Sequence, residues 1–202
     1  MIESGLIASN FLSSKFLAMS LELKVNSTVS KLTEKYENTS WNELATKVLN
    51  DQHFKKTLST LMENHSKGIS FQPGFNQIFS VFDNDLSTIQ VIVVYPDALE
   101  ELPAYASRDN VTIVRSPLTH SKGVDNDSLW ESFVRQLLKE IAYRTIKTIF
   151  LFVGDETEKY KSVVGKGHYK FFVPKEPEFE MSKVYDNIND LLKKIDREPI
   201  NW

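Results

Sequence analysis

The pattern of hydrophobic and polar positions predicts that the first part of the chain is helical. An apolar stripe with helical spacing runs from about Trp41 to His65, with a break near Asp51. A further short helix is expected after Pro73. Upstream, residues 1–39 carry apolar side chains that can share one helix face: Leu6, Ile7, Phe11, Phe16 and Met19. This N-terminal extension is expected to pack on the rest of the chain or to dock a partner.

Beyond residue 88, short β-branched and aromatic runs alternate with helical stretches. Four runs are expected to be strands: 89–94, 111–114, 149–153 and 169–173. An amphipathic helix at 130–141 separates the second strand from the third, Gly154-Asp155 lead into another helix, and a last helix covers about 182–194. Because strands alternate with helices, the pattern predicts an α/β fold, with three layers, α/β/α, around a central four-stranded parallel sheet.

The composition excludes several classes of function. The 202 residues include no cysteine, which rules out disulfides, cysteine-bound zinc, iron–sulfur clusters and thiol catalysis. The four histidines have no metal-ligand spacing and no phosphate-binding loop motif is present, so we expect neither a metal nor a cofactor. The formal net charge of -3 argues against a strongly basic surface that coats nucleic acid.

The start of the chain does not look like a targeting segment. It lacks the basic leader of a signal peptide, and no apolar run approaches the roughly 18 residues that span a bilayer. We therefore expect an intracellular protein without membrane contact, cytoplasmic or nucleoid-associated, or inside a host cell if the source is a virus or phage. Secretion is not expected.

Several sequence landmarks occur in an order that resembles the family-1 uracil-DNA glycosylases. The clearest lies at the C-terminus, where 189–192 and then 199–202 resemble that family's Asn-x-Leu-Leu and Pro-Ile-Asp-Trp. The other landmarks are Ser40-Trp41, Pro73 with Ile78-Phe79, the run 89–93, and Leu118-Thr119 with Trp130-Glu131. The resemblance implies a uracil-DNA glycosylase-like α/β domain at 40–202, preceded by the helical extension at 1–39.

The residues that carry the chemistry of this family match less well than the landmarks. The family's Gly-Gln-Asp-Pro-Tyr-His motif, whose Asp positions or activates water, corresponds to 95–100, where Asp97 remains and Leu99 replaces the Tyr that excludes thymine. The Asn that reads uracil aligns with Arg115. The His-Pro-Ser-Pro-Leu loop, which stabilises the leaving uracil and supplies a wedge, corresponds to 173–179. That loop holds Pro174, Lys175 and Pro177 but no His.

Cleavage of an N-glycosidic bond needs a carboxylate near the sugar and a hydrogen-bond donor near the departing base. Asp97 is the catalytic candidate, with a solvated carboxylate in a turn as its structural alternative. Arg115 would not read the edge of uracil as an amide does, although Arg115 or Lys175 could replace the missing His electrostatically. We expect a catalytically inactive protein, repurposed as an accessory or structural protein that acts through protein contacts.

The sequence is also compatible with two other functions. One is a divergent DNA glycosylase that uses Asp97 to hydrolyse the bond to uracil or another base. The other is a DNA-binding module, because the stretch 159–175 has no acid and interleaves aromatics with five lysines: Lys159, Lys161, Lys166, Lys170 and Lys175. Glu176, Glu178 and Glu180 follow and would repel phosphates, so only weak DNA binding is expected. The structural alternative is a solvated helix and loop before a buried strand.

The sequence does not identify a partner. If the protein is catalytically inactive, we expect it to act on a protein partner. Some viral members of the family serve as adaptors in replication, so the resemblance includes a replication-accessory role of a viral or phage protein.

Overall fold

The computed structural model describes residues 3–73, 79–82, 84–96, 108–175 and 180–202, with the backbone alone for 3–17 and 80. The elements, with η for a 3-10 helix, are α1 (Glu3–Lys35), α2 (Asn42–Leu49), α3 (Gln52–Ser66), η1 (Ser80–Phe82), β1 (Val91–Tyr95), β2 (Val111–Arg115), α4 (Asn126–Arg144), β3 (Ile149–Val153), η3 (Asp155–Val163), β4 (Tyr169–Val173) and α5 (Met181–Lys194). Asp97, Leu99 and Pro177 lie outside the described residues.

The four strands form one parallel sheet in the order β2-β1-β3-β4. Val91 pairs with Val111 on one side and with Ile149 on the other, and Ile149 pairs with Tyr169, so the strands begin in line. All residues of the central strands β1 and β3 are buried, which explains their almost wholly apolar sequences. The predicted sheet is confirmed, and its third and fourth strands have the predicted bounds.

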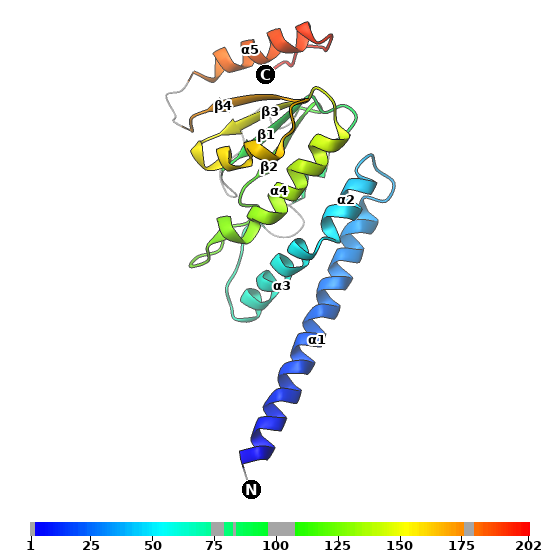
Figure 1. Ribbon diagram of the computed structural model, residues 1–202, viewed down its shortest axis with the longest axis vertical. Helices are drawn as coiled ribbons and strands as arrows, with labels where there is room; N and C mark the ends of the chain where they lie inside the picture. The colour runs from blue at the N-terminus through cyan, green and yellow to red at the C-terminus, as the bar shows by residue number, and fades with distance from the viewer. Residues whose placement is uncertain (1–2, 74–78, 83, 97–107, 176–179) are drawn as a thin grey trace.

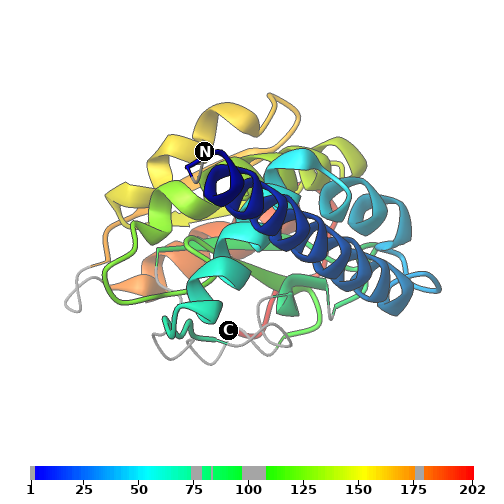
Figure 2. The same ribbon diagram turned by 90° about the horizontal axis from the view of Figure 1, so that it is seen from below.

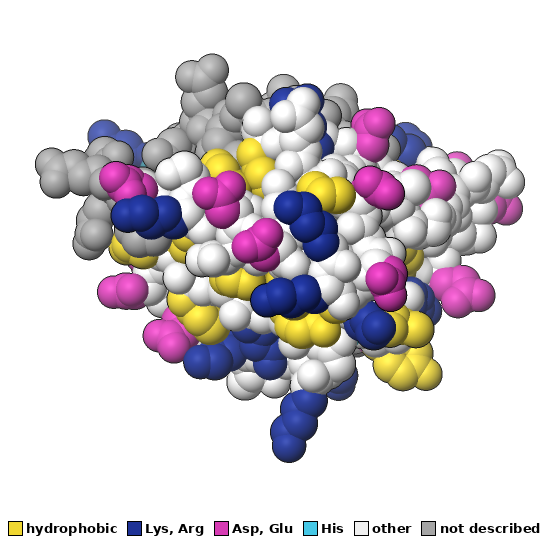
Figure 3. All heavy atoms as spheres, turned by 90° about the horizontal axis from the view of Figure 1, so that it is seen from above, with side chains coloured by type: hydrophobic (Ala, Val, Ile, Leu, Met, Phe, Trp, Pro, Cys, Tyr) yellow, Lys and Arg dark blue, Asp and Glu magenta, His cyan; other side chains and the backbone are white. Residues whose placement is uncertain are grey.

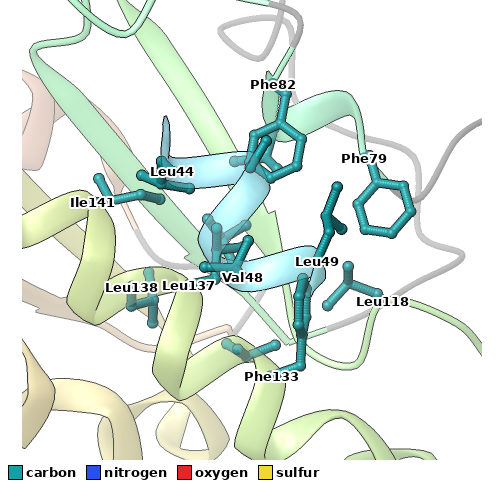
Figure 4. Packing of buried hydrophobic residues seen from close by; sticks show 14 of the residues in the cluster. Leu44, Val48, Leu49, Phe79, Phe82, Leu118, Phe133, Leu137, Leu138 and Ile141 are labelled. Atoms are coloured by element: carbon teal, nitrogen blue, oxygen red, sulfur yellow. The ribbon is translucent and has the colours of Figure 1, made fainter. Parts of the chain in front are cut away.

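Helices cover both faces of the sheet (Figure 1). Because successive strand residues point to opposite faces, Phe150 and Phe152 join the core under α4, whereas Leu151 joins a second core under α5. In the first core, α2 lies against α4, and their buried side chains interdigitate with Phe79 and Phe82 (Figure 4). The three-layer α/β/α architecture is therefore confirmed.

The helix α1 is long, and only its C-terminal part is packed. Val25, Val29 and Tyr36 are buried against α2 and α3, whereas the preceding turns project away from the rest of the molecule (Figures 1 and 2). Met19 and Leu23 are 58% and 64% exposed. The side chains of the other residues of the predicted apolar face, 6–16, lie outside the description. The domain boundary at residue 39 stays a prediction.

Residues of the sequence landmarks hold elements of the fold together. The Asn189 amide donates to the Ile200 carbonyl oxygen (3.0 Å) and accepts from the Ile200 N–H (2.8 Å), so the last residues are held on α5. Trp202 stacks on Tyr185, with ring centroids 4.4 Å apart. Buried Trp130 donates to Thr119 Oγ1 (2.7 Å), which ties α4 to the segment after β2. These residues therefore have structural roles.

The segment after Gly154 differs in detail from the predicted helix. It forms the 3-10 helix η3 rather than an α-helix. Its first turn is closed by a bond from the Thr157 N–H to the Gly154 carbonyl oxygen (3.2 Å), and the Thr157 hydroxyl donates to the same oxygen (2.9 Å). This i to i+3 bonding selects the tighter helix. Of the short helix predicted after Pro73, residues 80–82 form η1, and 74–78 lie outside the description.

Candidate functional site

The carboxyl ends of the four parallel strands meet at one edge of the sheet, where α/β folds bind their ligands. Arg115 ends β2 beside Tyr95, which ends β1, while Pro174 and Lys175 follow β4. The structure therefore places Arg115, Pro174 and Lys175 at the predicted edge. The assigned roles of Asp97 and Leu99, which follow β1 in the sequence, stay predictions.

At Gly154, described residues after β1, β3 and β4 lie close together. Its φ of 75° lies in the left-handed region, and its N–H donates to the Val173 carbonyl oxygen (2.8 Å). A Cβ on Gly154 would lie 3.3 Å from Pro96 Cγ and 3.5 Å from Lys175 Cβ. The Lys175 ammonium in turn lies 5.9 Å from the centroid of the Tyr95 ring. A glycine at this position thus lets the β4 loop approach the end of β1.

A hollow of about 260 Å³ opens at this same edge, between the loop after β2 and the N-terminus of α4. The residues that line it are Pro96, Pro117, His120, Val124, Asp125, Asn126 and Asp127. Of the described candidates, neither Arg115 nor Lys175 lines it. Sequence reasoning assigned no function to these polar residues. The only signal for them was the run Asp125-Asn126-Asp127 before an amphipathic helix, which is typical of a helix start.

The polar residues around this hollow are largely engaged in holding the loop. The Asp125 carboxylate caps α4 by accepting from the Ser128 hydroxyl (2.7 Å) and N–H (3.1 Å), and these bonds lower the pKa of Asp125. Buried Asn126 accepts from the Ser121 N–H (2.9 Å) and donates to the Ser121 carbonyl oxygen (3.0 Å). His120 and Asp127 are exposed. The arrangement is a hydrogen-bonded rim that carries ionisable side chains.

Beneath the rim, a buried pair of hydroxyls joins the end of β2 to η3. Ser116 Oγ and Tyr160 OH are 2.5 Å apart, and both residues are buried. Burial raises the pKa of the Tyr160 phenol above its ordinary value of 10.0, and the hydrogen bond with Ser116 opposes that shift only in part. Tyr160 therefore stays neutral as a structural group.

We expect Tyr160→Phe to lessen the alkaline sensitivity of the fold. Because the folded-state pKa of Tyr160 is raised, its contribution to stability is complete below the unfolded value near 10.0 and is lost as the pH rises through the folded value. Urea unfolding at pH 8 and at pH of about 11 should show a smaller loss for Tyr160→Phe than for the wild type. At pH 8 the variant should cost about 1–2 kcal/mol, since Ser116 loses its partner.

The matched control is Tyr143→Phe, because Tyr143 is exposed on α4. It should show the same alkaline loss as the wild type. Equal losses for all three proteins would show that the Tyr160 phenol ionises in the folded state as readily as in the unfolded one.

The predicted lysines fall into two groups. Lys159, Lys161, Lys166 and Lys170 surround a second hollow of about 520 Å³ on the flank of η3, here called the lysine hollow, together with Glu158 and Gly165. Lys175 lies apart from them at the carboxyl edge, beside Gly154. The sequence run 159–175 is therefore not one continuous surface. The structural alternative predicted a buried strand at the end of this run. The strand β4 is only partly buried, and its Phe172 is exposed.

Neither a cluster of metal ligands nor a membrane-spanning helix is found in the part of the chain that is described. Within those residues, no group of three or more His, Cys, Asp or Glu side chains is arranged to hold a metal ion. His168 has a structural position, with Nε2 2.8 Å from the Ala142 carbonyl oxygen. None of the described helices combines the length and the apolar character needed to cross a bilayer.

Known proteins with similar sequences or folds were compared with the chain. No family model matches the chain. The uracil-DNA glycosylase of Streptococcus sanguinis (strain SK36) is 20% identical to it over 214 residues, which cover 82% of this chain and 99% of that protein. The crystal structure of mimivirus uracil-DNA glycosylase has the same fold, with a TM-score of 0.68 and 15% identity over 81% of this chain and 86% of that one. The chain therefore has the fold of the uracil-DNA glycosylases and is similar in sequence to one of them.

Two further solved structures share this fold. They are variants of mimivirus UNG in complex with UGI, with TM-scores of 0.66 and 0.70 and identities of 14% and 16%. Each match covers 81% of this chain and 87% of that one. The resemblance drawn from the landmarks is confirmed. In this fold, the carboxyl edge of the sheet is the candidate functional site.

Proposed function

We propose that this uracil-DNA glycosylase-like protein is catalytically inactive and acts as an accessory or structural protein through protein contacts. The observation that carries the proposal is the projecting part of α1, which exposes Met19 and Leu23 one helical turn apart. Between residues 4 and 21, Lys15 is the only charged residue. Inserting these side chains into an apolar groove of a partner protein would remove their apolar surface from water and stabilise the complex.

The carboxyl edge supports the inactive half of the proposal. Arg115 stands where the resemblance implies an amide that reads uracil, and a guanidinium offers only donors to a base edge that presents both donors and acceptors. The chain also has no His after His168 to stabilise a departing base. Function resides in such site residues rather than in the fold, so a scaffold can persist without its reaction.

The test is excision of uracil from a labelled single-stranded oligonucleotide, with the S. sanguinis enzyme as positive control. A single strand spares the protein the cost of flipping the base out of a duplex. We expect no cleavage by the wild type at high protein concentration. Cleavage that disappears in Asp97→Asn would contradict the proposal and establish the alternative, a divergent glycosylase that uses Asp97.

The contact half of the proposal has its own readout. Tagged wild-type protein and the double variant Met19→Glu with Leu23→Glu should retain different proteins from cells of the source organism, because two carboxylates on α1 would prevent apolar docking. Glu22→Gln, on the same turn of α1, is the matched control and should behave as the wild type. A partner set that is unchanged by the double variant would show that this helix is not the contact.

A further inference from the structure

The edge strand β4 presents two different faces. Tyr169, Phe171 and Val173 belong to the core under α5, whereas the intervening Lys170 and Phe172 point toward η3. Phe172 is 41% exposed, although its ring stacks on buried Phe152 with centroids 5.1 Å apart and planes inclined by 10°. The side of β4 that faces η3 thus offers an aromatic ring in a fixed position beside a lysine.

The lysine hollow lies directly against this face. Lys170 belongs to both, and the Lys161 ammonium lies 4.5 Å from the centroid of the Phe172 ring. Lys166 and Lys170 form no ion pair with any residue that the structure describes. The pairs that do form are loose, since Lys161 lies 3.8 Å from Glu158, and Lys159 lies 3.6 Å from Glu131 on α4.

The charge of the hollow favours an anion with several charges. Four ammonium groups face one carboxylate there, in a protein whose formal net charge is -3. Like charges gathered in a concave surface raise the local potential and attract counter-ions. The backbone is also accessible, because a Cβ at Gly165 would meet no atom within 4 Å. Residues 164–166 precede β4, so the hollow lies toward the amino ends of the strands, away from the candidate site.

We propose that the lysine hollow and Phe172 form a binding site for single-stranded nucleic acid. The lysines contact successive phosphates. An unpaired base stacks on the exposed face of the Phe172 ring in place of the Lys161 ammonium, which turns to a phosphate. A cationic groove next to an exposed aromatic ring is the combination that binds single strands without reading their sequence. A duplex has no unpaired base that could stack on the Phe172 ring. The carboxylates of an acidic peptide could pair with the lysines but could not stack on the ring. The site is separate from the proposed protein contact on α1.

The experiment measures fluorescence anisotropy of a labelled thymidine oligonucleotide of about 15 nucleotides, titrated between about 50 and 200 mM salt. The affinity should fall steeply with salt, with a log–log slope of about -3 for four phosphate contacts. Lys166→Gln with Lys170→Gln should weaken binding roughly tenfold and make the slope shallower by about 1.4. Phe172→Leu should weaken binding by roughly tenfold with the slope unchanged.

The matched control is Lys183→Gln with Lys193→Gln, which makes the same change in charge on exposed positions of α5. The face that carries α5 mixes both signs of charge (Figure 3), and this control should bind as the wild type does. Thermal melts of all variants establish that each is folded. Lys175→Gln separates the hollow from the carboxyl edge and should leave binding unchanged.

Several results would overturn the proposal. These are no binding at low salt, an equal loss in the α5 control, or loss of binding in Lys175→Gln alone. Equal affinity for a duplex or for a glutamate-rich peptide, with no effect of Phe172→Leu, would show that the hollow is a general polyanion surface. Uracil excision does not enter these readouts, so they stand whatever the excision assay shows.

Discussion

Phe133→Ala is expected to lower the free energy of unfolding by about 3–5 kcal/mol. Phe133 lies at the centre of the core under α4, where its ring centroid is 4.9 Å from that of Phe54, 5.7 Å from Trp130 and 6.3 Å from Phe79. Truncation removes the buried ring and leaves a cavity between α3, α4 and the segment before β1. The neighbours are rings packed against one another, so they cannot collapse into that space.

Urea unfolding followed by circular dichroism measures this effect. Total stabilities of domains are of order 5–15 kcal/mol, so the variant should be marginally stable and should melt at a much lower temperature. Tyr143→Ala on the same helix is the matched control, because Tyr143 is 82% exposed, and it should cost less than about 0.5 kcal/mol. Equal costs for the two variants would show that α4 does not pack on the core through Phe133.

Glu140→Ala is expected to cost about 3 kcal/mol, through a different mechanism. The Glu140 side chain is only 4% exposed, and its carboxylate accepts from Arg144 Nη1 (2.8 Å) and Gln136 Nε2 (3.2 Å). Lys47 on α2 lies 2.6 Å from the same carboxylate, so this group also joins α2 to α4. Removing it leaves the guanidinium of Arg144 without its buried partner. Lys47 is half exposed and loses less because water can replace its partner.

Two further variants test this explanation by the same unfolding measurement. Glu140→Gln keeps the shape and one acceptor oxygen, and should cost less than Glu140→Ala. Glu131→Ala removes a carboxylate on another face of α4, which pairs with Arg135 nearer the surface (2.8 Å). It should lower the free energy of unfolding by less than about 1 kcal/mol. Similar costs at positions 131 and 140 would contradict the view that burial makes the Glu140 network important.

The elements and the sheet could be predicted from the sequence because their signals are local. A strand buried on both faces needs a short apolar run, and 149–153 and 169–173 carry that signal. Alternation of strands with helices then implies a parallel sheet, because each helix carries the chain back to the end of the sheet at which the previous strand began. Asn189 could also be recognised as a landmark from the sequence, because its amide both donates to and accepts from the Ile200 backbone, which few other side chains can do.

The site was predicted only in part. The sequence placed Arg115, Pro174 and Lys175 at the carboxyl edge, because the ends of parallel strands share an edge. It did not find the hollow beside His120 and Asp127, since those residues come together through the loop after β2. The roles assigned to Asp97, Leu99 and Pro177 remain predictions.

The order of elements, the α/β class and the resemblance all follow from periodicity and from residues near one another in the chain, so they could be predicted before the fold was known. Which lysines share a surface depends on the fold. Lys170 and Lys175 are close in sequence, yet one faces η3 and the other lies beside Gly154. Tertiary structure also made β4 an edge strand with an exposed Phe172, because strand order depends on contacts between distant segments. Local pattern sets the geometry of each element, whereas long-range packing determines which side chains meet.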